Sequence, residues 1–284
     1  MKRTILFLFS FVMATAMMAQ QDNNTLQNVS VMEFDYQVKE GPRSDVGVVV
    51  GAVLDVLADQ TTTEQPGYAE AARSSIIAAM GNVRRFRITD GRQVAPGEAT
   101  NIIVDGNINF ISVTRELRLR EKDKDRVPMF YAQISVTINL KDAATGTLIN
   151  GQTFEVNRSG WSWVNSTDTA MKNALEKLRK MVAKYYNAAF PYTARIIERG
   201  AEKKDKQKQV YIDLGSVHGL QEGTHFDVFV IGSIGGKETR KEIARLKVKE
   251  IEGDEVSLCK VTSGGRDLKA AMDAQQKLLI ISTD

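Results

Sequence analysis

Alternating apolar and polar positions in the middle of the chain predict a run of strands. From Phe130 to Leu140 every second residue is apolar, and most residues between them are polar. Such alternation is typical of a strand with one buried and one wetter face. Two polar turns interrupt the region. We therefore expect a three-stranded meander, with strands at 101–119, 129–140 and 148–161.

Two other segments have apolar residues at three- and four-residue steps, which predicts amphipathic helices. The first covers residues 68–82. The second follows Asn165, the expected N-cap, and extends to about Ala189 before Pro191 ends it. Shorter strands are expected in the same sheet at 29–36, 86–89 and 192–197. Together these elements predict an α/β (α+β) sandwich with a mixed sheet and flanking helices, over residues 29–198.

Residues 46–57 are apolar on nearly every side when they are drawn as a helix. A helix of that kind must be buried on most of its sides. We favour a third helix that covers the sheet. The alternative is an exposed surface for another protein, with Val49 and Leu54 as contact residues.

A charged stretch with few apolar residues, at 200–209, marks the expected linker between two domains. Beyond it the chain changes to short strand-like segments separated by turns that contain glycine. These segments lie at 210–214, 225–231, 243–251, 255–261 and 277–282. This pattern predicts a small all-β barrel over residues 210–284.

The N-terminus has the pattern of an export signal. Two basic residues are followed by an apolar stretch at 6–18 and by Ala19, a small residue suited to cleavage. We expect residues 1–19 to be removed as a signal peptide, which leaves a mature chain that begins at Gln20. The apolar stretch is too short for a stable membrane span, and residues 14–24 contain no cysteine for a lipid anchor. The expected location is therefore periplasmic or associated with the outer membrane, and the protein is not expected to be a lipoprotein.

The charge balance argues against nucleic acid as a partner. The formal net charge is +3, and it falls to about +1 without Lys2 and Arg3. A nearly neutral chain has no electrostatic attraction for a polyanion. The single Cys259 cannot form an internal disulfide, and its strand-like surroundings favour a buried thiol.

No motif in the chain predicts catalysis or a cofactor. His218 and His225 are the only histidines, and we expect solvated turn residues there rather than metal ligands. The glycine-rich segment 232–237 lacks the spacing of a phosphate loop, so a β-turn is expected. The chain also lacks a Gly-x-Ser-x-Gly nucleophile elbow. We expect a protein that is not an enzyme, and a hydrolase is the less favoured alternative.

Two tryptophans, Trp161 and Trp163, follow the third strand of the meander. If the strand continues, they lie on the face opposite Phe154 and Val156. We favour cover by the long helix. The alternative is an exposed aromatic contact for a partner protein.

The order of the elements resembles the curli-assembly CsgG and LpoB family of envelope proteins. Three segments carry the resemblance: Arg85-Phe86-Arg87-Ile88-Thr89-Asp90 after the first helix, Ile102-Ile103-Val104-Asp105-Gly106-Asn107-Ile108, and the turn between Leu140 and Leu148. It covers about residues 29–198 and extends to the long helix. Separately, residues 210–223 resemble the small barrel that ends flagellar assembly T proteins.

The family includes a secretion channel whose hairpins extend into a membrane barrel. A membrane strand needs about ten residues with one apolar face, whereas the corresponding hairpin here is densely charged between Arg115 and Arg126. The resemblance therefore implies a non-catalytic envelope protein that binds, scaffolds or regulates an envelope machine. A channel subunit is the alternative. The expected partners are envelope proteins or further copies of this chain.

Overall fold

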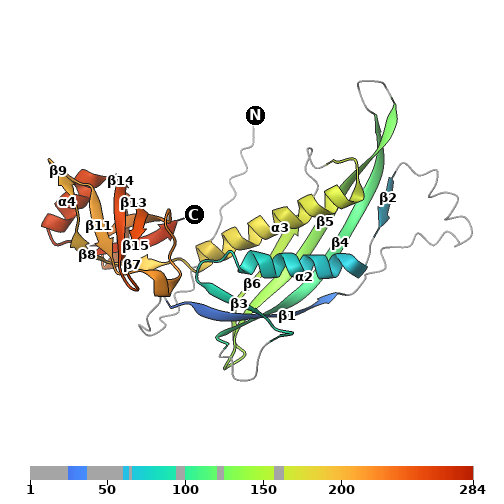
Figure 1. Cartoon of the computed structure of the whole chain (residues 1–284), viewed down its shortest axis with the longest axis horizontal. Coiled ribbons are helices and arrows are strands. Elements are labelled where there is room, and N and C mark those ends of the chain that lie inside the picture. Colours follow the sequence, from blue (N-terminus) through green and yellow to red (C-terminus); the bar gives the residue numbers. More distant parts are fainter. Residues whose placement is uncertain are drawn as a thin grey trace, which may run out of the picture.

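The computed structural model describes residues 25–36, 60–63, 66–93, 100–119, 125–156 and 163–283 (Figure 1). These residues form two bodies side by side along the long axis of the molecule. The first is a six-stranded sheet with two helices, and the second is built on a seven-stranded sheet with one short helix. Residues 1–19, predicted as a signal peptide, and residues 46–57, with Val49 and Leu54, lie outside the described residues.

The first sheet is mixed, as the sequence predicts. Its strand order is β3-β1-β4-β5-β6, and β2 pairs with β4. Strand β1 is parallel to β3 and β4, and the other pairs are antiparallel. The strands are β1 (Gln27–Tyr36), β2 (Gln60–Thr63), β3 (Phe86–Asp90), β4 (Ile102–Leu119), β5 (Arg126–Asp142) and β6 (Leu148–Val156).

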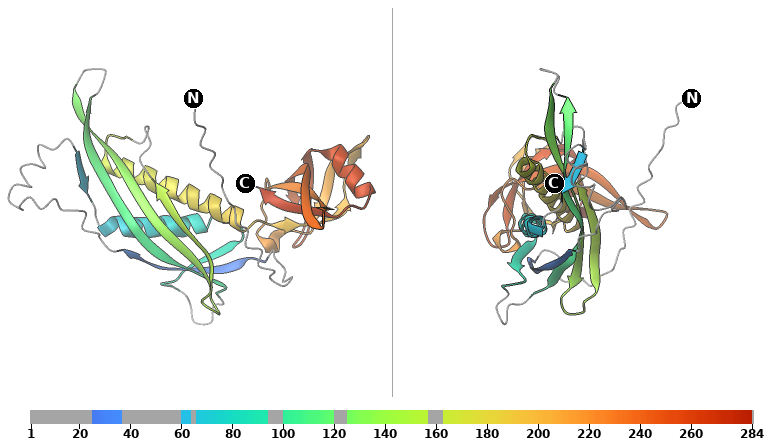
Figure 2. Two further views of the ribbon diagram at one scale, coloured as in Figure 1. Left: turned by 180° about the vertical axis from the view of Figure 1, so that it is seen from behind. Right: turned by 90° about the vertical axis from the view of Figure 1, so that its right-hand side faces the viewer.

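Helices α2 (Pro66–Met80) and α3 (Thr167–Ala189) cover one face of this sheet (Figure 2). On β5 the expected alternation is confirmed, because Ile134, Val136, Ile138 and Leu140 are buried while the residues between them are partly exposed. Fully buried helix residues pack against that face. They include Ile76, Met80, Leu178 and Val182. Each such side chain contributes roughly 1.5–3 kcal/mol through removal of apolar surface from water.

The N-cap of α3 is Ser166 rather than the expected Asn165. The Ser166 hydroxyl oxygen accepts a hydrogen bond of 3.3 Å from the backbone N–H of Thr169. A serine hydroxyl at this position satisfies one of the free N–H groups of the first turn. Asp168 adds a negative charge there, which the helix dipole favours. In the described residues, every helix is too short or too polar to cross a membrane.

The second sheet is nearly closed on itself. Its order is β7-β15-β12-β13-β14-β11-β8, and both edge strands come from residues 193–199. A sheet whose two edges belong to one short segment has to curl round, which agrees with the expected small barrel. The strands are β7 (Thr193–Ala194), β8 (Ile196–Arg199), β11 (Gln209–Ile212), β12 (His225–Ile234), β13 (Lys237–Ile251), β14 (Ser257–Ser263) and β15 (Leu278–Thr283).

Residues 192–197, which the sequence assigned to the first sheet, therefore belong to the second. The reason is packing: Tyr192 and Ala194 are buried in the second core, and β7 pairs with β15. Helix α4 (Gly265–Asp273), whose Leu268 enters the same core, was not predicted from the sequence. The period of a nine-residue helix extends over too few turns to stand out.

The stretch 200–209, predicted as a linker, contains a small hairpin of β9 (Glu202–Lys203) and β10 (Lys206–Gln207). Gln207 is fully buried, and its side-chain amide donates to the carbonyl oxygens of Gly200 and Gln209 at 3.2 and 2.7 Å. The charges of this stretch thus lie on the solvent side of a hairpin attached to the second sheet.

The two bodies meet at Tyr192. Its hydroxyl lies 3.0 Å from the carbonyl oxygen of Arg84 in the first body and 2.9 Å from that of His218 in the second. Asn187, near the end of α3, supports the same point, because its side-chain oxygen accepts a hydrogen bond of 3.1 Å from the N–H of Arg84. One buried hydroxyl, whose single proton is shared between two carbonyl oxygens, therefore joins both bodies.

A pair of tyrosine substitutions tests this junction. Tyr186 and Tyr192 are both buried, yet the Tyr186 hydroxyl has no hydrogen-bond partner among the described residues. Tyr186→Phe should leave the free energy of unfolding unchanged or raise it by about 1 kcal/mol, because an unsatisfied buried hydroxyl is removed. Tyr192→Phe should lower it by about 1–2 kcal/mol, because the hydroxyl whose single proton is shared between two carbonyl oxygens is lost. Urea unfolding of both variants provides the measurement, and a larger loss for Tyr186→Phe would contradict it.

Candidate contact site on the projecting hairpin

Strands β4 and β5 form a hairpin that projects beyond the helices (Figure 1). Their pairing runs from Ile102 opposite Asp142 to Leu119 opposite Arg126. Strand β2 pairs with the outer half of β4, where Thr63 lies opposite Val113 and Gln60 opposite Glu116. We call the outer part of this hairpin, residues 110–119 and 126–132, the arm.

The face of the sheet opposite the helices carries a ladder of polar side chains. The amide nitrogen of Asn109 donates to the hydroxyls of Ser135 and Thr137 at 3.4 and 2.9 Å. Thr137 in turn lies 2.9 Å from the hydroxyl of Thr153 on β6. Asn109 sits at a β-bulge, which turns its side chain toward these hydroxyls. This face is therefore a hydrogen-bonded polar surface across three strands.

Trp163 is placed against the arm. Its ring meets Tyr131 edge to face, with centroids 4.6 Å apart and an interplanar angle of 78°. The guanidinium carbon of Arg118 lies 4.6 Å from the centre of the tryptophan ring, which is a cation–π contact. The next residue, Val164, bridges Phe130 by two backbone hydrogen bonds of 2.7 and 2.9 Å.

This geometry settles which side of the arm Trp163 occupies. Phe130 and Val164 pack against the first core, and neighbouring residues of an extended chain point to opposite faces. Tyr131 and Trp163 therefore lie on the face away from the helices. The favoured expectation that α3 covers Trp163 is replaced by a contact with the arm, and Trp161 lies outside the described residues.

The end of the arm combines charge with exposed apolar surface. Arg115, Glu116 and Arg118 are partly exposed on β4, and Leu119 is 62% exposed. Arginine and tryptophan side chains are enriched where proteins bind one another. Arg118 and Trp163, which are both partly exposed and lie over the buried Tyr131, form the candidate contact site, and Leu119 lies beside them at the end of the arm.

The two histidines of the second body lie in a turn and at the start of a strand. The Nδ1 atom of His218 accepts a hydrogen bond of 3.1 Å from the N–H of Gly215, which holds a turn. His225 is exposed at the start of β12. No group of three or more His, Cys, Asp or Glu side chains is placed to hold a metal in the described residues.

Two expectations about Cys259 and the glycine-rich segment are confirmed in this body. Cys259 is fully buried, and burial raises the pKa of its thiol to about 12, so the reactive thiolate is disfavoured. The glycine-rich segment forms the turn between β12 and β13. There Gly235 and Gly236 have φ angles of +59° and +78°, which residues other than glycine rarely adopt.

Comparison with known proteins does not place the chain in a family. No family model matches it, and no curated protein shows significant similarity. Solved structures that resemble it include protein XCC0632 from Xanthomonas campestris, with 9% identity, a TM-score of 0.35, and coverage of 59% of this chain and 85% of that one. The PelC dodecamer from Paraburkholderia phytofirmans has 17% identity, a TM-score of 0.30, and coverage of 56% and 86%. A minor lipoprotein from Acinetobacter baumannii has 13% identity, a TM-score of 0.25, and coverage of 58% and 93%.

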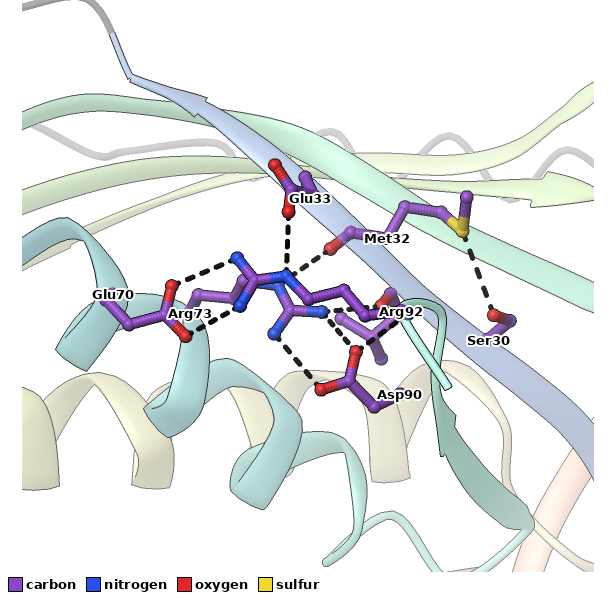
Figure 3. A network of polar contacts seen from close by, with 8 residues as sticks. Ser30, Met32, Glu33, Glu70, Arg73, Asp90 and Arg92 are labelled. Carbon is purple, nitrogen blue, oxygen red and sulfur yellow. Dashed lines mark hydrogen bonds and ion pairs between the residues drawn. The ribbon is translucent and has the colours of Figure 1, made fainter. Parts of the chain in front are cut away.

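A polar network on α2 fixes the position of that helix (Figure 3). Arg73 is only 3% exposed, and its guanidinium donates to the backbone carbonyls of Val31 and Met32 on β1 at 3.1 and 3.2 Å. It also forms an ion pair with Asp90 at the end of β3, with contacts of 2.5 and 3.3 Å. One side chain thus ties α2 to two parallel strands.

Nearby, Arg92 extends the network to the surface. Its guanidinium contacts Glu33 at 2.7 Å and Glu70 at 3.0 Å, and both carboxylates are largely exposed. Such exposed pairs contribute little to stability because water screens them. The carboxylates shown in Figure 3 are all engaged by arginines, so the arrangement acts as a clamp.

One feature of the sequence indicates this clamp. Position 73 lies four residues after Ala69 and three before Ile76, on the apolar stripe of the predicted helix. A charged residue within a buried stripe requires a partner, since unpaired charge is costly to bury. The sequence pattern does not identify Asp90 as that partner, because the pairing depends on where the end of β3 lies relative to α2 in the folded chain.

The clamp makes the free energy of unfolding depend on pH. Hydrogen bonds from Arg73 lower the pKa of Asp90 from its usual 3.8 to about 2, so the carboxylate stabilises the fold when charged. That contribution is complete above about pH 4 and is lost as pH falls through about 2. Asp90→Asn should lower the free energy of unfolding at pH 7 by about 2 kcal/mol, because it leaves Arg73 without a charged partner. The variant should also lose less stability than the parent between pH 4 and pH 2.

Glu70→Gln is the matched control. It removes an exposed carboxylate of the same network, and it should cost less than about 1 kcal/mol. Denaturant titrations of both variants at several pH values test the difference. Equal losses of unfolding free energy for Asp90→Asn and Glu70→Gln at pH 7 would contradict the expectation that the ion pair of the buried Arg73 contributes more to stability.

Proposed function

We propose that the protein is an exported, non-catalytic binding module of the cell envelope, and that the arm is its contact site for another protein. One observation carries the proposal: the partly exposed Trp163 and Arg118 are stacked over the buried Tyr131 on the projecting hairpin, on the face away from the helices. An aromatic anchor beside an arginine is the composition of energetically important contact residues.

The N-terminal sequence supports the cellular location. A basic start, an apolar stretch and Ala19 match an export signal, so the module works outside the cytoplasm. The resemblance of residues 29–198 to the CsgG and LpoB family supports the same compartment. It also supports a role in assembling or regulating an envelope machine rather than in catalysis.

The charges of the arm favour binding over the alternative of a channel subunit. In a channel the outer hairpin would have to enter the bilayer, where one arginine at mid-depth costs about 2–4 kcal/mol. Arg115 and Arg118 lie in the outer part of β4, and Arg126 lies opposite Leu119. These side chains suit the surface of another protein, where carboxylates can pair with them.

Site-specific photo-cross-linking in the producing cells tests the proposal. A photoreactive residue at Leu119, on the arm, should form a discrete adduct with an envelope protein or with a second copy of the chain. The same residue at Thr145 is the control, because that exposed turn lies after the opposite end of β5. Adducts of equal yield at both positions, or none at Leu119, would contradict the arm as contact site.

Substitution of the cluster gives an independent measurement. Arg118→Glu should reduce the Leu119 adduct about tenfold or more, because truncating one buried interfacial charge typically costs 2–5 kcal/mol. The melting temperature should change little, since Arg118 is partly exposed. Adduct formation that survives this change would assign the contact to another surface.

Export is tested separately by mass spectrometry of the envelope fraction. The mature chain should begin at Gln20 and carry no lipid. A chain with intact Met1, recovered from the cytoplasm, would contradict the location while leaving the contact site open to the cross-linking test.

A further inference from the structure

Strand β6 is an open edge of the first sheet. Among the described residues it pairs with β5 on one side, and no strand pairs with its other side. Such an edge presents a row of backbone N–H and C=O groups to which a further strand can bond. The other edge strands of this sheet are shorter, because β3 has five residues and β2 has four, whereas β6 has nine.

The backbone groups of β6 that point outward follow from its pairing. On β5, Phe130 exchanges two hydrogen bonds of 2.7 and 2.9 Å with Val164, on the side away from β4. Alternate residues of a strand turn their backbone groups to the same side, so Ile138 is bonded to its β6 partner Gln152. The residues of β6 whose backbone groups point away from β5 are therefore Gly151, Thr153 and Glu155.

The contacts at Thr153 agree with this assignment. The side-chain amide of Gln152 donates a hydrogen bond of 2.9 Å to the carbonyl oxygen of Thr153, in the position that a neighbouring strand would otherwise fill. Gly151, Thr153 and Glu155 are all exposed. Edge strands are often protected by proline, lysine or a bulge. Residues 150–156 contain neither proline nor lysine, and they pair with β5 without a shift of register.

Helix α3 places positive charge beside this edge. Arg179 lines a groove between α3 and α2. Leu178 is buried against the sheet, so Lys177, one residue before it, lies on the side of α3 away from α2. That side lies over β6, because the Tyr185 hydroxyl accepts a hydrogen bond of 3.2 Å from the side-chain amide of Asn150.

A second lysine continues the same line. Lys184 follows Lys177 by about two helical turns, a rise of about 10 Å, which corresponds to about three residues of a strand. Both lysines are exposed, and neither forms an ion pair with another described residue. Lys180 differs, because it pairs with Glu176 at 2.6 Å. A strand added to β6 would therefore lie beside two separate positive charges.

We propose that the open edge of β6 binds an extended segment of another protein, which carries carboxylates and joins the first sheet as a further strand. The outward backbone groups require an extended partner, and Lys177 and Lys184 select its negative charge. A second copy of β6 is a poor occupant, because a two-fold axis at this edge would bring the same lysines of both copies together. This surface is separate from the arm, and it does not rest on the contact proposed there.

Two synthetic peptides test the proposal, one of alternating valine and glutamate and one of alternating valine and lysine. Fluorescence anisotropy of the labelled peptides follows their binding to the mature chain. The acidic peptide should bind saturably, with one site per chain and about tenfold or more tightly than the basic peptide. Its affinity should fall as salt is raised, because exposed charges are screened. No saturable binding of the acidic peptide, or equal affinity for both peptides, would overturn the proposal.

Hydrogen exchange followed by NMR locates the bound peptide. In the free chain the N–H groups of Gly151, Thr153 and Glu155 should exchange faster than those of Gln152 and Phe154, which are bonded to β5. The acidic peptide should slow exchange at the first three positions, and unchanged exchange there would overturn the site. Slowing that appears at high protein concentration without peptide would assign the edge to a second copy, which would also overturn the proposal.

Variants separate the backbone from the charge. Thr153→Pro removes an outward N–H without removing a bond to β5, so it should weaken binding of the acidic peptide about tenfold while the melting temperature changes little. Lys177→Glu combined with Lys184→Glu changes only exposed side chains, and it should favour the basic peptide over the acidic one. Lys237→Glu, on the β12–β13 hairpin, is the matched control and should leave both affinities within about twofold. Unchanged preference in the double lysine variant would overturn the proposal.

Discussion

The first body depends on strand β4, because three other strands take their position from it. Strand β5 pairs with one edge of β4 along its whole length, and β1 and then β2 pair with the other. Close packing is required at Gly106, where a Cβ atom would lie 1.9 Å from the carbonyl oxygen of Thr137 and 2.9 Å from the ring of Phe34. Only glycine fits between these neighbours. The same strand then extends past the helices to form the arm, so the candidate contact site is continuous with the centre of the sheet.

The second body depends on the segment that follows α3. An open sheet leaves two rows of unpaired backbone groups at its edges, which favours aggregation. Here β7 and β8 supply both edges, and only Arg195 separates them. A barrel cut at residue 200 would therefore lose both edge strands and the buried Tyr192. The junction between the bodies thus lies at the end of α3, where Asn187 and Tyr192 both hydrogen-bond to the backbone of Arg84.

The sequence predicted the elements whose periodicity extends over many residues. The alternation of β5, the long α3 and the buried Cys259 all correspond to the structure. Features decided by distant partners were not predictable in this way. Residues 192–199 have a strand-like sequence that would fit either sheet. Their pairing with β11 and β15 places them in the second sheet. The charges at 200–209 indicate solvent exposure equally well for a linker and for a hairpin. Likewise Trp163 is recognisable as a contact candidate, but its place beside Arg118 depends on the length of the arm.

Helix α3 connects the arm to the junction between the bodies. Its first turn follows Val164, which is bonded to the arm, and Asn187 near its last turn holds the backbone of Arg84. With 23 residues the helix is about 35 Å long, at 1.5 Å per residue. Leu178 and Val182 bury its middle in the first core, which anchors the helix between its two ends. The length of α3 therefore sets the distance between the arm and the junction.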